Sequence, residues 1–188
     1  MMIHRSNITT KDRSIFHDNI YAIFKGKVID SKHIASHNFF NQKVAIIGTD
    51  QHTVSQLSFI YQHSVSVTVY QIKPEYILPK TEKIFQRLIP SLFIKQQKNL
   101  TQRIKSLISL HFLDVKVVNQ WLKSQLRPNI AIKPKTFLRS DDYYTTLQKN
   151  NCHLITWPIK EIGTNSITTI DETYHPTDII IIADYQID

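Results

Sequence analysis

The chain has 188 residues, of which 41% are hydrophobic and 20% are charged, and these are the proportions of an ordinary globular domain. Its formal net charge of +8 would attract acidic partners such as a phosphate-bearing cofactor, a nucleic acid or an anionic membrane surface, although no nucleic-acid recognition motif accompanies the basic residues. The single cysteine, Cys152, excludes an internal disulfide, and the lack of any apolar stretch of about 18 residues excludes a membrane span.

The beginning of the chain is polar and has no apolar segment of the signal-peptide type, so we expect a cytoplasmic protein. We expect residues 1–23 to form an N-terminal arm and residues 24–188 to form one domain. Residues 15–34 mix aromatic and aliphatic side chains without a regular period, which predicts an extended segment.

A strand, a helix and a second strand are predicted next. Residues 43–48 include a continuous apolar run, which is typical of a buried parallel strand. Residues 50–63 carry apolar side chains at helical spacing, and residues 64–70 alternate valine with other side chains as a strand does. The apolar positions of the helix are Val54, Leu57, Ile60 and Tyr61. These three elements make a βαβ unit.

The second half of the chain predicts a helical part followed by strands. Pro74 and Pro79 enclose a predicted loop, and Pro128 ends the helical part. Helices are expected over 81–94 and 97–126, with a further helix start at 141–142. Strands are expected over 153–156, 159–162, 167–170 and 179–183. The predicted fold class is α/β, with a Rossmann-like parallel sheet, a helical insertion and a β-rich C-terminal portion.

Two segments near the start carry a fingerprint. Phe24 and Gly26 fit the pattern Phe-x-Gly-x-x-x-His-x-x-x-Trp, whereas Asp30 and Ile34 stand at its His and Trp positions. The strand over 43–48 then leads into a turn of the type Gly-x-Gly-x-x-Gly/Ala. This pair of segments resembles flavin-containing monooxygenases of the Baeyer–Villiger type.

Later segments extend the resemblance to most of the chain. Residues 69–80 match a family segment with both prolines in place, residues 135–152 match a segment containing Ser-Asp-Asp-Tyr-Tyr, and residues 178–183 match a strand that precedes Ala-Thr-Gly. The resemblance implies the NADP-binding domain that this family inserts into its flavin domain. No glycine-rich flavin motif precedes residue 43, so we expect no complete flavin site.

The turn after the first strand departs from the family pattern. A dinucleotide turn needs three small residues, and here Gly48 supplies the first, Asp50 stands at the second and Thr53 at the third. A like charge at ~4 Å from a phosphate costs about 1 kcal/mol in water and about 4 kcal/mol at an effective dielectric of 20. Asp50 is therefore expected to weaken pyrophosphate binding ~10- to ~1,000-fold.

The resemblance implies a set of cofactor-binding positions in and after this turn. They are Gly48, Thr49, Asp50, Gln51, His52, Gln71 and Lys73. The position of the family's arginine holds Ile72. The adjacent Lys73 could reach a 2′-phosphate in its place, or it could be a solvated loop lysine. We expect no tightly bound cofactor: NADP would bind weakly, and FAD is not expected.

The positions that carry the family's chemistry are changed. Asp30 cannot replace the fingerprint histidine, since an ordinary aspartate is ionised at neutral pH, and Ile34 is expected to serve packing. Asp184 and Tyr185 follow Ala183 where the family has Thr-Gly-Tyr/Phe. We therefore assign no catalytic residue.

Other patterns do not indicate an active site. His33 and His37 lack the further ligands of a zinc site, and Ser140 lacks the partners of a hydrolase nucleophile. The acidic pair at 141–142 is explained by the positive end of a helix dipole. Cys152 is expected to be a small buried group.

Three functions remain open on the sequence. The first is a degenerate flavin-monooxygenase-like protein that keeps a nicotinamide-nucleotide-binding fold without standalone oxygenase activity. The second is the nicotinamide-binding subunit of a split flavin-dependent oxidoreductase, with a flavoprotein as partner. The third is a basic module on the same fold that binds protein or, less expectedly, nucleic acid.

Overall fold

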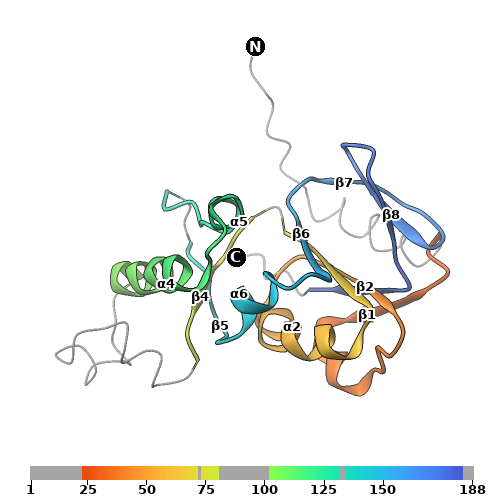
Figure 1. Cartoon of the computed structure of the whole chain (residues 1–188), viewed down its shortest axis with the longest axis horizontal. Helices are drawn as coiled ribbons and strands as arrows, with labels where there is room; N and C mark the ends of the chain where they lie inside the picture. The colour runs from red at the N-terminus through yellow and green to blue at the C-terminus, as the bar shows by residue number, and fades with distance from the viewer. Residues whose placement is uncertain (1–22, 72, 81–101, 132–133, 184–188) are drawn as a thin grey trace, which may run out of the picture.

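The computed structural model describes residues 23–71, 73–80, 102–131 and 134–183. A central sheet lies beside a helical part in Figure 1. Residues 1–22 of the expected N-terminal arm, the expected helix over 81–94, residues 97–101 of the next expected helix, and Ile72, Asp184 and Tyr185 lie outside the described residues. Among the described residues, no helix is both long and apolar enough to cross a membrane.

Five parallel strands form the central sheet, in the order β1-β10-β2-β3-β6. Their bounds are β1 Lys27–Asp30, β2 Lys43–Ile47, β3 Ser66–Tyr70, β6 Cys152–Ile155 and β10 Ile179–Ile182. The predicted α/β fold with a Rossmann-like sheet is therefore confirmed. β1 is a finding beyond the prediction, because its four residues have no period that distinguishes a strand from an extended segment.

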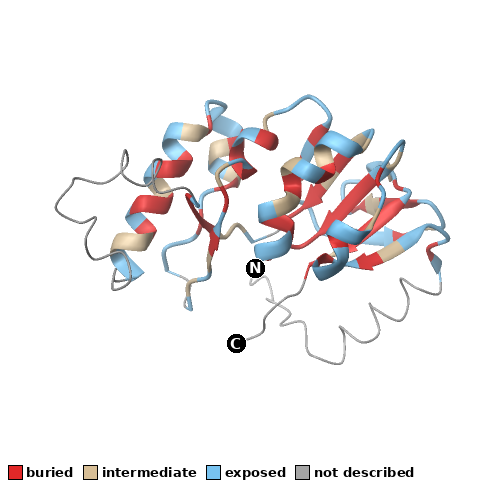
Figure 2. Cartoon of the chain, turned by 90° about the horizontal axis from the view of Figure 1, so that it is seen from below, coloured by how far each residue is buried: buried red, intermediate tan, exposed pale blue. Residues whose placement is uncertain are grey.

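Strand β2 is apolar on both faces because both faces of the sheet are covered. Val44 and Ile46 pack in one core with helix α2, Gln51–His63. Ala45 and Ile47 point to the opposite face, where they pack with residues of the C-terminal strands. Figure 2 shows the buried residues concentrated on the central strands and on the facing sides of the helices.

A three-stranded antiparallel meander covers the second face. It consists of β7 Ile159–Ile162, β8 Ser166–Thr169 and β9 Tyr174–Pro176. Its Ile162 and Ile167 pack on Ala45 and Ile180 of the central sheet. The two predicted strands here are confirmed within one residue. The short β9 was not predicted, because Tyr174–Pro176 has no alternating pattern.

The insertion between β3 and β6 contains helices and a small parallel sheet. The helices are α4 Gln102–Lys116, α5 Gln120–Gln125 and α6 Tyr143–Thr146. The strands are β4 Tyr76–Leu78 and β5 Phe137–Arg139, which pair in parallel.

Two predictions for this region are wrong in detail. The expected single helix over 97–126 is interrupted, because Asn119 takes an extended conformation and its side chain caps α5 by accepting the N–H of Leu122 at 3.0 Å. The expected loop between Pro74 and Pro79 contains β4, whose three residues are all buried. A strand this short is specified by its partner β5 rather than by local sequence.

Candidate functional site

The sheet order places a topological switch point at the carboxyl ends of β2 and β10. From β2 the chain crosses through α2 to β3 on one side, while β10 lies on the other side. Ligands of open parallel sheets bind at such a switch point. Around it lie Ser31, which follows β1, the turn after β2, which begins at Gly48, and Ala183, which follows β10.

Gly48 makes the turn after β2 in the way the sequence predicts. Its φ is 86°, which lies in the left-handed region that glycine adopts without strain. Its N–H donates to the carbonyl of Tyr70 at 2.9 Å. Beside it, the N–H of Ala183 donates to the carbonyl of Ile47 at 3.0 Å. The tight turn predicted after β2 is therefore present.

Asp50 caps helix α2. Its carboxylate accepts the N–H of Thr53 at 2.7 Å, while its own N–H donates to Thr53 Oγ1 at 2.9 Å. This reciprocal capping box satisfies backbone donors that the first turn of a helix otherwise leaves free. The side chain that we predicted to oppose a pyrophosphate thus has a structural use, and Asp50 is buried at 8% exposure.

Ser31 binds the same carboxylate from the other side of β10. Its hydroxyl donates to Asp50 Oδ2 in a short buried hydrogen bond. Ser31 directly follows β1 and Asp50 lies just after β2, so the bond passes over the end of β10, which runs between them. An aspartate carboxylate therefore sits where anions bind at a helix N-terminus. No local pattern indicated Ser31, because this contact depends on where two different strands end.

The other turn residues are used by the fold or face solvent. Gln51 donates from Nε2 to the carbonyl of Arg139 and accepts the N–H of Arg139, both at 2.9 Å. This paired contact ties α2 to β5. Thr49 is half-buried and His52 is exposed. The Gln51 side chain therefore has a structural role at the start of α2.

Gln71 and Lys73, the two positions expected at the end of β3, do not form a joint site. Gln71 is buried, and its Oε1 accepts the hydroxyl of Tyr143 at 2.9 Å. Burial raises the pKa of Tyr143 well above its ordinary value, so the hydroxyl remains a donor. Lys73 is 56% exposed and lies 3.8 Å from a carboxylate oxygen of Glu75. Burial raises the pKa of Glu75, and the charge of Lys73 opposes that rise.

Phe24 and Gly26 serve packing rather than a ligand. Phe24 is buried among the residues between the sheet and the meander. A Cβ on Gly26 would lie 2.3 Å from the carbonyl oxygen of Asp178 and 2.5 Å from the Phe24 ring. Downstream, the Asp30 carboxylate accepts the N–H of Lys32 at 2.8 Å. Ile34 is fully buried, which confirms its predicted packing role.

The remaining candidates also have structural explanations. Cys152 is buried as predicted, and burial raises the pKa of its thiol to about 12. Ser140 Oγ accepts the N–H of Tyr143 at 3.1 Å at the start of α6. Asp142 occupies the N-cap position of α6 without a side-chain cap bond. Within the described ranges, no cluster of three or more His, Cys, Asp or Glu residues could hold a metal ion.

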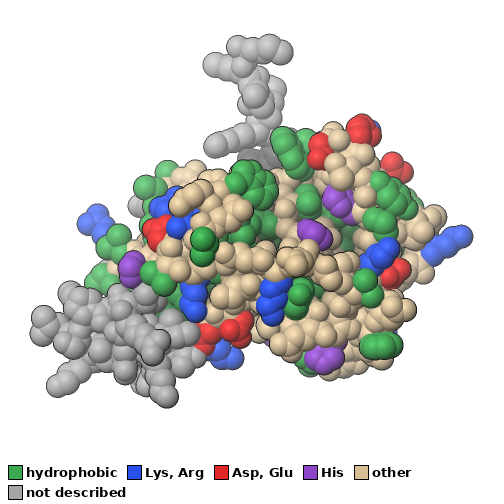
Figure 3. All heavy atoms as spheres, viewed as in Figure 1, with side chains coloured by type: hydrophobic (Ala, Val, Ile, Leu, Met, Phe, Trp, Pro, Cys, Tyr) green, Lys and Arg blue, Asp and Glu red, His purple; other side chains and the backbone are tan. Residues whose placement is uncertain are grey.

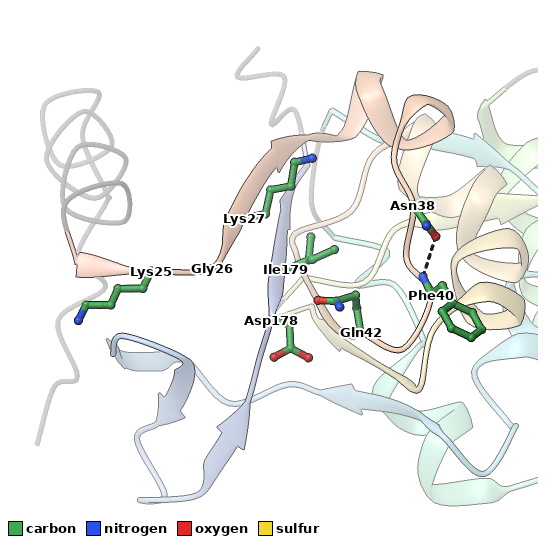
Figure 4. Close-up of a pocket in the computed structure, with 8 residues that line it drawn as sticks. All are labelled: Lys25, Gly26, Lys27, Asn38, Phe40, Gln42, Asp178 and Ile179. Atoms are coloured by element: carbon green, nitrogen blue, oxygen red, sulfur yellow. Dashed lines mark hydrogen bonds between the residues drawn. The ribbon is translucent and has the colours of Figure 1, made fainter.

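A separate hollow of about 590 Å³ lies at the amino ends of β1 and β10, where Figure 4 shows its lining. Asp178 Oδ2 accepts the N–H of Lys43 at 2.8 Å, and Asn38 Oδ1 accepts the N–H of Phe40 at 2.9 Å. Lys25 points away from Phe40 in this view. These side chains do not converge on a common point, and the hollow lies at the opposite strand ends from Gly48.

Comparisons with known proteins agree with this fold. An FAD-binding monooxygenase of Aspergillus niger is 24% identical to this chain, in an alignment that covers 85% of this chain and 30% of that protein. A Baeyer–Villiger monooxygenase of Pseudomonas aeruginosa is 23% identical, with 84% of this chain and 34% of the relative covered. The chain thus spans about a third of these curated relatives. No family model matches the chain.

Solved structures give the same result. A steroid monooxygenase bound to NADP superposes with a TM-score of 0.67 at 15% identity, over 86% of this chain and 42% of that one. Cyclohexanone-bound cyclohexanone monooxygenase superposes with a TM-score of 0.69 at 13% identity, over 89% of this chain and 45% of that one. The shared fold covers less than half of each of these enzymes.

Proposed function

Because this chain is a relative of the Baeyer–Villiger monooxygenases with the fold of a flavin-monooxygenase-like nucleotide-binding domain, we propose that its dinucleotide turn is closed by its own Asp50. In this proposal the chain does not bind NADP tightly and does not carry out oxygenation alone. The bound carboxylate of Asp50 is the observation that supports it.

A pyrophosphate does not fit the turn as it stands. It would have to displace Asp50 from the N–H of Thr53 and from the Ser31 hydroxyl, or lie beside a carboxylate that remains in place. The first route loses an N-cap worth about 1 kcal/mol. The second meets the like-charge cost of about 1 to about 4 kcal/mol. Both routes lower the affinity of the chain for NADP. Without a bound cofactor, the chain does not oxidise NADPH.

Titration with NADPH tests the proposal directly. A micromolar site would stabilise the protein by about 4 kcal/mol at millimolar NADPH, which a thermal-shift measurement detects easily. We expect no saturable shift in the wild-type chain. The variant Asp50→Gly removes the carboxylate and keeps a residue that helix N-caps tolerate, so its NADPH affinity should rise ~10- to ~1,000-fold.

The matched control is Asp142→Gly, which also removes an N-cap aspartate, but one whose side chain makes no cap bond. It should leave NADPH affinity unchanged. Micromolar binding of NADPH by the wild type would contradict the proposal, and so would an equal response of the two glycine variants.

A second candidate is a nicotinamide-binding subunit that works with a separate flavoprotein. It is favoured by the retained left-handed turn at Gly48 and by the exposed Lys73, because a cation near the end of the second strand suits a 2′-phosphate. This candidate requires NADPH to shift the melting temperature of the wild-type chain. Loss of that shift in Lys73→Ala would assign the 2′-phosphate to Lys73, whereas no shift in the wild type would exclude the candidate.

A further inference from the structure

A second hollow, of about 870 Å³, lies between strand β6 and helix α5. It runs along the whole of β6 and is the size of an ordinary ligand pocket. We call it the β6 groove. Its lining residues are Val118, Asn119, Trp121, Leu122, Leu147, Gln148, Lys149, Asn150, Cys152, His153, Leu154, Ile155 and His175. None of them belongs to the turn around Asp50.

One wall of the β6 groove is an open sheet edge. β6 is the last strand in the sheet order, with β3 as its partner. The N–H of Val67 donates to Asn151 at 2.8 Å and the N–H of Gln71 donates to Ile155 at 2.9 Å. Residues alternate in which edge their backbone groups face, so the N–H and C=O of Leu154 face away from β3. Leu154, which is 8% exposed, supplies one such pair of groups, and unpaired groups at the edge of a sheet are a template for another strand.

The opposite wall offers an apolar anchor. Trp121 on α5 is 62% exposed and the nearby Val118 is 82% exposed. Tryptophan is usually well buried in monomeric proteins, and it is enriched among the residues that carry most of the energy of protein interfaces. An open strand edge beside an exposed tryptophan suits an extended peptide, whose backbone pairs with the edge while one side chain meets the ring.

The charge of the β6 groove selects for an acidic occupant. Lys149, whose Nζ lies 4.6 Å from the centre of the Tyr61 ring, is the lysine of its lining, and no described aspartate or glutamate lines it. The imidazoles of His153 and His175 add ring nitrogens that can take part in hydrogen bonds. His175 Nε2 is buried without a hydrogen-bond partner in the described structure. Figure 3 shows histidine side chains exposed over the region of β6. The chain as a whole carries a net charge of +8, which would draw an acidic segment toward it.

We infer that the β6 groove binds an extended, acidic segment of a partner protein, which adds to β6 as a further strand. Leu154 supplies the backbone pairing, Trp121 the apolar contact and Lys149 the positive charge. A second copy of this chain is a poorer occupant, because two chains that each carry a net charge of +8 repel one another. This inference does not depend on nucleotide binding.

Selection from a library of displayed random peptides of roughly nine residues, long enough to span an ordinary strand, tests the inference on the full chain. We expect enriched peptides to alternate Asp or Glu with β-branched or aromatic residues. Synthetic versions should bind at least about tenfold more weakly to Trp121→Ala, the factor that corresponds to about 1.4 kcal/mol. Charge reversal in Lys149→Glu should also weaken them.

The matched control is Trp157→Ala. Trp157 is 55% exposed, close to the value for Trp121, and it does not line the groove, so this variant should bind as the wild type does. Hydrogen exchange supplies a second readout: bound peptide should slow exchange of the Leu154 amide, and peptides with proline at alternate positions should fail to do so.

Four outcomes would overturn the inference. They are no enrichment, enrichment of basic peptides, binding that Trp121→Ala leaves unchanged, and unaltered exchange at Leu154. A dimer that sedimentation detects and Trp121→Ala abolishes would also overturn it, since the occupant would then be a second copy of the chain.

Discussion

Two glycine-containing segments of this molecule differ in how far they keep the residues of the family pattern. At the corner formed by Phe24 and Gly26, both fingerprint residues are present, and both are held by packing against the meander and the start of β10. At the turn that begins with Gly48, only the first small residue remains, and Asp50 and Thr53 form a capping box instead.

The difference separates two kinds of constraint. A residue such as Gly26 is fixed by its neighbours in the same chain, so replacing it disturbs the fold with or without a cofactor. The second and third small residues of a dinucleotide turn are required by the approach of a pyrophosphate and by close helix packing. At Asp50 the side chain forms a helix cap. Gly26 therefore reports the fold, and in our proposal Asp50 reports the loss of tight NADP binding.

The largest expected effect tests the packed corner. In Gly26→Ala, the new Cβ would lie 2.3 Å from the Asp178 carbonyl oxygen and 2.5 Å from the Phe24 ring. Backbone cannot move aside as a flexible side chain can, so we expect destabilisation of about 3 kcal/mol from overpacking. Urea unfolding measures this change in the free energy of unfolding.

Gly163→Ala is the control for this prediction. Its Cβ would come only within 3.0 Å of the Ser166 hydroxyl, which can rotate, so the free energy of unfolding should change by less than about 1 kcal/mol. Equal effects of the two alanines would show that Gly26 is not fixed by close packing.

A smaller effect tests the closed turn. Asp50→Ala removes the acceptor for the N–H of Thr53 and leaves the buried Ser31 hydroxyl without its acceptor. Loss of an N-cap costs about 1 kcal/mol, and the unpaired hydroxyl adds about 1 kcal/mol. We expect about 2 kcal/mol in urea unfolding, and less in Asp50→Asn, which keeps an acceptor oxygen. Asp142→Ala, whose side chain makes no cap bond, should change stability by less than about 0.5 kcal/mol. If Asp50→Ala costs no more than that, the carboxylate does not hold the turn.

The parts of the fold that were predictable carry their signal locally. β2 is predicted by the apolar run over 43–48, and α2 is predicted by the helical spacing of Val54, Leu57 and Ile60. In both cases burial of the element requires apolar residues at a regular spacing along the sequence. β1 and β4 have no such period, since each is defined by a partner far along the chain.

The candidate site was predictable only in part for the same reason. Gly48 was identified because a turn of this geometry requires glycine. Asp50 was recognised as unsuited to a phosphate, but its hydrogen bond to Ser31 joins residues that follow two different strands. Gln51 and Gln71 stay predictions as ligand contacts, and their amides pair with Arg139 and Tyr143 within the chain. Such contacts depend on how elements meet in space, which no local pattern records.

The smallest expected effect concerns His175, which lies between the sheet and the β6 groove. Burial lowers the pKa of its imidazole below 6.5, opposed by the charge of Asp171 and aided by that of His153. The folded state then binds fewer protons than the unfolded state, so this contribution to stability is fully present above about pH 6.5 and is lost as the pH falls through the folded pKa.

The wild type should therefore lose more stability between about pH 7.5 and about pH 5.5 than His175→Phe does, because phenylalanine keeps a ring against Tyr70 but has no proton to bind. Urea unfolding at several pH values measures the difference. His52→Phe, at an exposed position on α2, should retain the wild-type slope. If the His175 variant retains it as well, burial of this imidazole is not the cause of the pH dependence, and the wall of the β6 groove beside Tyr70 must be open to water.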